Sequence, residues 1–454
     1  MKKIILLPLL PVVMISFLTA SAYGWGSATH AYIAKELGKE FGLVNLQEMY
    51  GSTLPDMVNL KNIPPMEPYN SLYAKFHFIE EGSQEAIINQ AKWCLEEAFV
   101  YGFASHNDAW GADYTAHHNA ASIPGPDLGY VTEKKLEPIA ELGLMENLSA
   151  ILIDAGFPLE QALILAAALT PTVTELGIEV GVDILIKRNE DPAIGLRLFI
   201  SALFRDSCIP NLLARAYSGS DEALTEIIIN SEREFRDMMV LYGKALLLDE
   251  EAAINGIITQ WIPVVSGLVE KLYPGIEISK QIEERFIALG VEVVNEGIRV
   301  CESDYYDEIW ATIDAVGERL EKEGIHTCIM VERPLTPDIK VNGSDGPITL
   351  NQSDTLSITV ALDNNGIMDN ANWWLVAGTP FGIYFYTFDG WTTDWVPAYQ
   401  GPLFYLEPFE VLNIPLLGLQ PGTYTLCFGV NTYMNGNVTC DSVYYDTIVV
   451  NVTE

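Results

Sequence analysis

The sequence predicts a multi-domain protein, an all-α multi-helix domain followed by an all-β sandwich. From Glu133 to about Leu320, apolar residues recur at the 3.6-residue spacing of helices. Beyond residue 334 they recur in short alternating runs separated by Gly, Asn, Asp and Pro. The length of 454 residues also exceeds what one hydrophobic core usually serves. We therefore expect a helical domain over residues 25–333 and a β-sandwich over 334–454.

Residues 1–24 have the pattern of a secretory signal peptide. A Lys pair precedes an apolar run from Ile4 to Ala20, and Ala22 and Gly24 are the small residues expected before a cleavage site. Cleavage there would leave Trp25 as the N-terminus. No later charge-free apolar run is long enough to span a bilayer. We therefore expect a soluble protein that is secreted, periplasmic or held at the cell surface.

The net charge of −36 comes from 61 acidic residues against 25 basic ones. Such a surface repels polyanions, which disfavours long nucleic acid as a partner and disfavours an anionic membrane unless bound cations reverse the sign locally. The six cysteines form no CxxC motif, so a cysteine zinc site is not expected. Cys301 with Cys328 and Cys427 with Cys440 are the nearest pairs, but the sequence leaves the disulfide pairing open.

Imidazole and carboxylate groups gather in the stretch 103–120. The chain has only six histidines, and three of them fall here. If the stretch is one helix, His106, Asp113 and His117 lie on one stripe, because seven and eleven residues make about two and three turns. His118 points elsewhere. A lone His–Asp pair is more often a core-edge histidine beside a solvated charge, but three aligned groups suit zinc.

Weaker candidates lie before this stretch. Taken singly, His30 is typical of a surface residue near a helix start, Asp56 of a helix cap after Pro55, and His77 of a core histidine. A free N-terminus at Trp25 would add a chelating amine and carbonyl, because an α-amino group loses its proton readily.

A stripe of carboxylates follows in the predicted helix Thr174–Lys187, which we expect to be separate from the helix Gln161–Leu169. Glu175 and Glu179 lie one turn apart within an apolar sequence. A solvated face is the usual interpretation of such a stripe, but the apolar neighbours make a partly buried one credible.

These residues together resemble the zinc-dependent phospholipase C and P1-type nuclease superfamily over about residues 25–120. The opening Trp25-Gly-Ser-Ala-Thr-His30 and the His77-Phe-Ile79 element are similar to the nuclease branch. Ser105-His106 and Asp113-Tyr-Thr-Ala-His117 are more similar to the phospholipase C and D branch. The order that carries the resemblance is Trp25, His30, Asp56, His77, His106, Asp113 and His117.

The resemblance implies two or three zinc ions and hydrolysis of a phosphodiester. By analogy Asp113 bridges two ions, with Trp25 and His30 on one and with Asp56, His77 and His106 on the other. His117 would serve a third ion with Glu179 and Glu175, which have the spacing of the family's later His-x-x-x-Asp/Glu pair, with Glu in place of His. A second departure is that six residues separate His106 from Asp113, where the family has three.

The resemblance leaves three functions open. A phospholipase C-like enzyme acting on phospholipid headgroups is the leading one, with Asp56 as the catalytic residue that orients water. A P1-type single-strand nuclease or nucleotidase is the alternative, and a metal-binding surface protein without turnover is the third.

The region after residue 334 reads as roughly seven strands, of immunoglobulin-like size. It contains no histidine, so we expect it to bind or to position. Trp373, Trp374, Trp391 and Trp395 are candidates for surface contact with lipid or glycan, with core packing as an equal alternative.

Calcium ligation in the β-sandwich is a weak possibility. The segments Asp363–Gly366 and Asn435–Asn437 carry oxygen ligands, but neither completes a loop with regular ligand spacing, and turns are the commoner interpretation.

Overall fold

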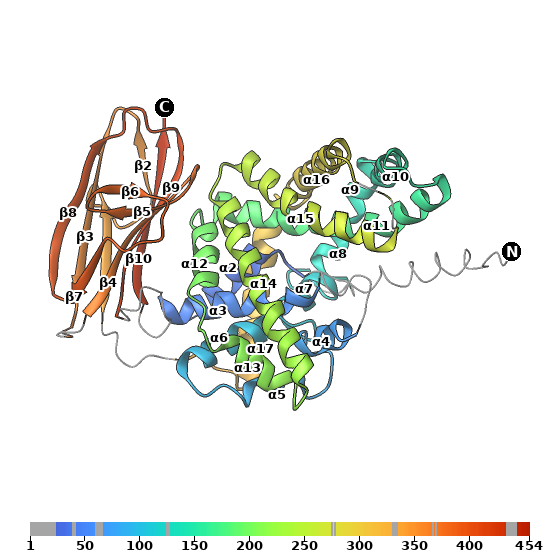
Figure 1. The fold of residues 1–454 in the computed structure, drawn as a ribbon, viewed down its shortest axis with the longest axis horizontal. Coiled ribbons are helices and arrows are strands. Elements are labelled where there is room, and N and C mark those ends of the chain that lie inside the picture. Colours follow the sequence, from blue (N-terminus) through green and yellow to red (C-terminus); the bar gives the residue numbers. More distant parts are fainter. Residues whose placement is uncertain are drawn as a thin grey trace.

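The computed structural model describes residues 24–38, 42–59, 67–123, 128–273, 276, 278–328, 335–365, 367, 370–432 and 443–454. Within this part of the chain a multi-helix region over residues 27–322 is followed by a β region of two sheets, as the sequence predicts (Figure 1). The predicted signal peptide lies outside the described residues, apart from Gly24. The predicted domain boundary near residue 334 also lies outside them, between the last helix and the first strand.

The helical region begins with short helices and continues with long ones. The short helices at the start carry most of the candidate site residues. They are α2 (Ser27–Leu37), α3 (Leu43–Thr53), the 3₁₀ helix η1 (Leu54–Val58), α4 (Tyr69–Phe76), α5 (Ser83–Ile88), α6 (Cys94–His106), α7 (Ala112–His117), α8 (Tyr130–Lys134) and α9 (Leu136–Glu141). The later helices are α10 (Leu144–Asp154), α11 (Leu159–Asn189), α12 (Ile194–Leu203), α13 (Ile209–Tyr217), α14 (Glu222–Leu246), α15 (Glu250–Leu272), α16 (Lys280–Cys301) and α17 (Tyr305–Lys322).

The stretch expected to form one helix through 103–120 is broken, and that expectation is wrong. α6 ends at His106, and the Asn107 side chain then accepts hydrogen bonds from the backbone N–H groups of Ala109, Trp110 and Gly111 at 2.9, 2.9 and 3.3 Å. A local side-chain acceptor of this kind competes with helical hydrogen bonding and favours a turn. The chain therefore reverses before α7 begins.

The two helices expected at 161–169 and 174–187 are instead one helix, α11, of 31 residues with Pro171 inside it. Proline removes one helical hydrogen bond and usually breaks a helix. Here α11 packs against α10 and α16, and the burial of its apolar residues offsets that loss. By length and composition α11 could cross a membrane, and half of its apolar window is buried inside the fold.

The β region consists of a small sheet and a large one. The small sheet has the order β1 (Thr336–Val341), β3 (Thr355–Asp363) and β8 (Leu406–Pro415). The large sheet has the order β2 (Ile348–Asn351), β10 (Val443–Thr453), β9 (Gly422–Asn431), β4 (Asn370–Thr379), β5 (Gly382–Thr387) and β6 (Gly390–Thr392), with β7 (Tyr399–Pro402) also paired to β4. The pairing is antiparallel except between β2 and β10.

The large sheet lies between the small sheet and the helices (Figure 1). Successive strand residues face opposite sides of a sheet, and β4 uses both faces. Trp373 and Leu375 belong to the core between the two sheets, whereas Trp374 and Val376 belong to the core shared with the helical region. This double burial explains why β4 is buried along almost its whole length.

Burial divides the four candidate tryptophans. Trp373 and Trp374 are buried, so core packing, not surface contact, accounts for them. Trp391 is partly buried and packs edge-on against Tyr386 at 5.3 Å between ring centroids. Trp395 remains 37% exposed, and its ring packs against Phe204 at the helical boundary, 6.0 Å away.

A disulfide joins Cys94, at the start of α6, to Cys328, beyond the end of α17. Cys301 is a buried free thiol, so the nearest-neighbour pairing of Cys301 with Cys328 is wrong. Cys427 is also a buried free thiol, and Cys440 lies outside the described residues. A disulfide between α6 and the segment after the last helix is typical of oxidising compartments, which agrees with an extracellular protein.

The first predicted calcium segment is a turn in its described part. The backbone N–H of Asn365 donates to Asp363 Oδ1 at 2.9 Å, and the Asn364 amide donates to the Ile367 carbonyl at 2.8 Å. Gly366 and the second segment, residues 435–437, lie outside the described residues.

Candidate metal centre

Close packing of two helices positions the first histidine. Gly102 of α6 lies so near α3 that a Cβ added to it would sit 1.9 Å from the Glu48 carbonyl oxygen. This approach, which only glycine permits, brings the Ser52 carbonyl within 2.8 Å of His106 Nδ1. The carbonyl accepts a hydrogen bond from Nδ1–H, so Nε2 is the nitrogen of His106 that faces the centre.

Two other histidines arrive from separate elements. His77 follows the last residue of α4, and its Nδ1 lies 3.1 Å from the Tyr73 carbonyl, which leaves Nε2 for the centre in the same way. Phe78 then adopts a φ of 55°, rare for a non-glycine residue, and ends the helix at this point. His30 lies in α2, and its ring stacks on that of His106 at 4.1 Å.

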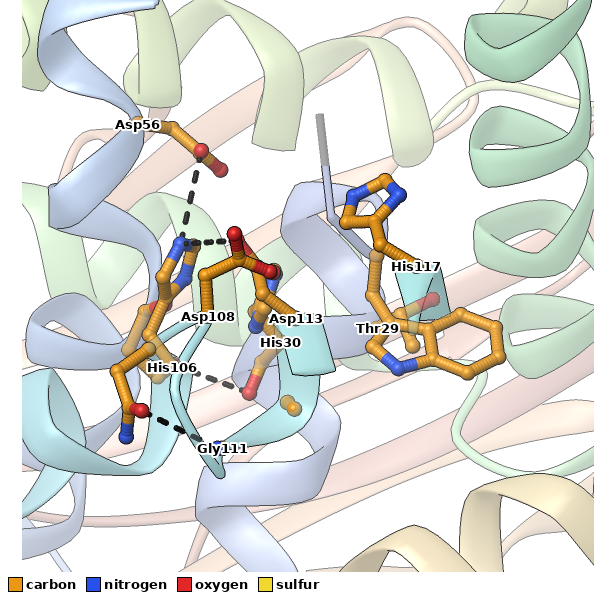
Figure 2. A network of polar contacts seen from close by, with 12 residues as sticks. Thr29, His30, Asp56, His106, Asp108, Gly111, Asp113 and His117 are labelled. Atoms are coloured by element: carbon orange, nitrogen blue, oxygen red, sulfur yellow. Dashed lines mark hydrogen bonds and ion pairs between the residues drawn. The ribbon is translucent and has the colours of Figure 1, made fainter. Parts of the chain in front are cut away.

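Asp113 lies between the three imidazoles and is 1% exposed. Its Oδ1 is 3.0 Å from His30 Nε2, whereas its Oδ2 is 2.9 Å from His106 Nε2 and 3.5 Å from His77 Nε2. The two oxygens therefore face two different sets of nitrogen, as Figure 2 illustrates for His30 and His106. Such a carboxylate is suited to bridge two cations.

Asp56, in η1, completes the first cluster. Its Oδ1 is 3.7 Å from His77 Nε2 and 3.6 Å from His106 Nε2. One ligand atom from each of Asp56, His77, His106 and Asp113 lies within 4.8 Å of the other three. Four ligands at zinc-bond length in a tetrahedron lie about 3.3 Å apart, so these separations fit the coordination shell of one ion.

A second cluster lies beside the first. His117 of α7 meets Glu175 and Glu179 of α11, and one ligand atom from each lies within 4.8 Å of the others. His117 Nδ1 is 3.5 Å from Glu175 Oε1, while Lys135 holds the other oxygen of Glu175 at 3.1 Å. Among the described residues, His117 Nε2 and Glu179 Oε1 are buried without a hydrogen-bond partner. Buried polar atoms are rarely left unpaired, and a cation here would satisfy both.

Burial and mutual charge set the protonation of these groups. Burial alone would raise the pKa of Asp113, but the His106 and His30 imidazoles hold it well below its usual value. Burial opposes a charge on His106, yet Asp113 and a second carboxylate raise its pKa to about 9. Burial lowers the pKa of His117 to about 4 and, with neighbouring carboxylates, raises that of Glu179 well above its usual value. Asp113 and His117 thus stand in the forms that bind a cation.

Trp25 lies against both clusters. It is buried, its indole N–H donates to Thr115 Oγ1 at 3.2 Å, and its ring packs on Tyr130 at 5.4 Å. A Cβ added to Gly24 would lie 1.5 Å from Asp113 Oδ1. The backbone just before Trp25 therefore lies close to Asp113 Oδ1, the oxygen that faces His30.

Asp183 is a further buried carboxylate, one turn beyond Glu179. Its oxygens accept hydrogen bonds from the N–H groups of Ala28 and Thr29 at 3.0 and 2.7 Å and from the Tyr242 hydroxyl at 2.7 Å. Gly26 supplies no side-chain cap to α2, so Asp183, which is distant in sequence, caps the helix instead. This contact holds the first turn of α2, and therefore His30, in place.

Two acidic groups nearby serve other purposes. Asp108 belongs to neither cluster and pairs with half-exposed His118 at 2.9 Å, while its backbone N–H donates to the His77 carbonyl at 3.0 Å. The exposed group Glu137, Glu141 and Glu296 surrounds the guanidinium of Arg299 at 2.6, 3.2 and 2.5 Å. An arginine already neutralises this group.

A pocket of about 60 Å³ opens above the clusters and was not foreseen from the sequence. Trp25, Asp56 and Glu179 form its polar floor, and Phe235 and Met239 of α14 lie among its apolar walls. No lysine or arginine is among its lining residues. The α14 residues carry no motif, and only their packing over η1 and α11 reveals them.

No protein-family model matches this chain, and no curated protein matches it in sequence. The fold and the site define its class by themselves: a helical protein with two adjacent buried His/Asp/Glu groups of the kind that hold metal ions, followed by a two-sheet β region.

Proposed function

We propose that the protein is a secreted, zinc-dependent phosphodiester hydrolase, most similar in activity to a phospholipase C. The observation that carries the proposal is the convergence of Asp56, His77, His106 and Asp113, from four separate elements, on one buried point. Nitrogen and carboxylate ligands in a roughly tetrahedral set favour zinc over calcium or magnesium.

Asp113 would bridge two ions, through Oδ1 with His30 and through Oδ2 with His77 and His106. Zinc bound here would supply a hydroxide near neutral pH and would clamp the phosphoryl oxygens. Asp56 is 15% exposed, whereas Asp113 is 1% exposed. Asp56 therefore reaches the pocket, where it would orient the attacking water and accept its proton.

The second cluster would hold a third ion through His117, Glu179 and Glu175. The raised pKa of Glu179 means that a cation must displace a proton from it. Binding at this position should therefore release a proton, and occupancy of two or three ions per chain is expected.

Signal-peptide cleavage before Trp25 would complete the coordination shell of the ion that His30 and Asp113 Oδ1 share. The backbone at Gly24 lies against Asp113 Oδ1, so its removal would leave the Trp25 amine beside that oxygen and His30. An extra residue retained before Trp25 should weaken zinc binding, whereas an extra residue at the C-terminus should not.

The pocket favours a lipid headgroup over a polynucleotide. Its walls include Phe235, Met239 and Trp261, and no basic side chain lines it. A nuclease site for a polyanion would need positive charge along its groove, and the net charge of −36 works against it. A P1-type nuclease or nucleotidase is the alternative, and a metal-binding protein without turnover is the third candidate.

The deciding experiment supplies the zinc-loaded protein with phosphatidylcholine, single-stranded DNA and a chromogenic phosphodiester. Release of diacylglycerol that is lost in Asp56→Asn and kept in Asp345→Asn supports the proposal. Release of nucleotides instead supports the nuclease. No turnover at full zinc occupancy overturns an enzymatic role. Asp345→Asn is the control because Asp345 lies in the β region, is exposed and pairs with Lys340.

A further inference from the structure

A second, larger cavity of about 170 Å³ lies between α10, α11, α15 and α16. Its walls are aliphatic and aromatic side chains, such as Leu148 of α10, Leu169 of α11 and Phe286 of α16, together with glycines. An apolar cavity of about 150 Å³ is known to stay dry and to bind benzene. This cavity is therefore large enough for a segment of hydrocarbon and offers little to a polar ligand.

The cavity and the metal pocket share a wall. Leu176 and Val180 of α11 and Trp261 of α15 line both of them. Along α11, Leu169, Val173, Leu176 and Val180 follow the spacing of one helical face, so a single stripe lines the cavity. Glu175 and Glu179 lie one residue before Leu176 and Val180, and so about 100° around the helix. One helix thus presents carboxylates to the metal clusters and a hydrocarbon surface to the cavity.

The chain has a net charge of −36, and an almost wholly apolar space next to a phosphoryl site does not suit a nucleotide, whose base and ribose carry polar edges. A phosphodiester that carries an aliphatic chain has a group suited to each of the two neighbouring pockets. The shared wall of Leu176, Val180 and Trp261 is where the two parts of such a substrate would join.

We propose that the cavity between α10, α11, α15 and α16 binds one aliphatic chain of the substrate, which makes the protein selective for phosphodiesters of lipids. That this aliphatic chain belongs to a substrate rests on the proposed phosphodiesterase activity. The binding of an aliphatic chain in the cavity does not depend on that activity. Each buried methylene should raise kcat/KM about fourfold until the cavity is full.

Two measurements test this inference. The first titrates the full-length, zinc-free protein with a fluorescent long-chain fatty acid, which needs no catalysis. The second measures kcat/KM for monomeric phosphatidylcholines of stepwise increasing chain length. Val173→Trp fills the cavity, and Leu169→Phe fills it less drastically if the first variant does not fold. Leu163→Trp is the matched control, because Leu163 lies on the same helix, is 41% exposed and does not line the cavity.

We expect saturable fatty-acid binding that Val173→Trp weakens and Leu163→Trp does not. The ratio of kcat/KM between the longest and shortest lipids should fall about 15-fold in the filled variant, which corresponds to two excluded methylenes. This ratio is internal to each variant, so a loss of folded protein does not change it.

Failure of the cavity and failure of the proposed function give different results. Hydrolysis of the chromogenic diester without any dependence on chain length, and with no fatty-acid binding, overturns the cavity proposal and leaves the hydrolase. Fatty-acid binding that Val173→Trp removes, in a protein that hydrolyses nothing, supports the cavity and overturns the hydrolase. Fatty-acid binding that is equal in the wild type and both filled variants overturns the cavity.

Discussion

Replacement of Asp113 by asparagine keeps the shape of the side chain and removes the charge that both oxygens offer to His30, His77 and His106. If two zinc ions share this carboxylate, each at a hundredfold excess over its Kd, they stabilise the folded chain by about 2.7 kcal/mol apiece. At roughly 2 °C per kcal/mol for a domain of this size, zinc should raise the Tm of the wild type by about 10 °C.

In Asp113→Asn we expect most of this zinc-dependent shift to vanish, because the bridging ligand is lost to both ions. Scanning calorimetry with zinc and with a chelator measures the shift, and elemental analysis of the same samples gives the zinc content. Asp345→Asn, at an exposed position of the β region, is the control and should keep the full shift. An Asp113→Asn protein that retains two zinc ions and the wild-type shift would refute the bridging geometry.

Three further predictions concern protonation, the β region and the turn between α6 and α7. Zinc affinity should rise with pH between about 6 and 9, because the pKa of His106 is raised to about 9 and zinc must displace the proton from its imidazole. Calorimetry in buffers of different ionisation enthalpy should record this proton release. An affinity that does not change with pH contradicts the prediction. Removal of the β region after residue 328 should cause aggregation, visible by light scattering. Trp374 and Val376 of this region help to bury a face of the helical region, which the truncation would expose. A soluble, monomeric truncated chain contradicts the shared core. Asn107→Ala should cost roughly 1–3 kcal/mol in denaturant unfolding, because it leaves the backbone N–H groups of Ala109 and Trp110 without their acceptor. It should also lower zinc content, and unchanged zinc content contradicts a positioning role for the turn.

The two-part fold could be predicted because periodicity is a local property of the sequence. The helices around α14 and α16 and the main strands follow from spacing alone. Long-range facts could not be predicted in this way. The Cys94–Cys328 bridge spans 234 residues, and nothing near either cysteine specifies its partner. The direction in which Trp373 and Trp374 face depends on what covers each side of the large sheet.

The candidate site residues could be named from their types and order, but the geometry that unites them could not. On one continuous helix, His106 and Asp113 would lie about 10 Å apart along the axis, too far for one ion to bind both. The observed separation of 2.9 Å between His106 Nε2 and Asp113 Oδ2 exists because the helix breaks. The helical stripe therefore grouped His106 with Asp113, which do lie together, but it relied on a continuous helix that the structure does not have.

The break between α6 and α7 also accounts for the length of the segment between His106 and Asp113. The residues from Asn107 to Gly111 form a turn in which the N–H groups of Ala109, Trp110 and Gly111 donate to the Asn107 side-chain oxygen. This turn reverses the chain and begins α7 with Asp113 in its first turn, facing His106 instead of following it. Six residues between ligands are then not an interruption of the site, since they provide the reversal that places both oxygens of Asp113 between His30 and His106. The zinc content of Asn107→Ala measures how far the centre depends on that reversal.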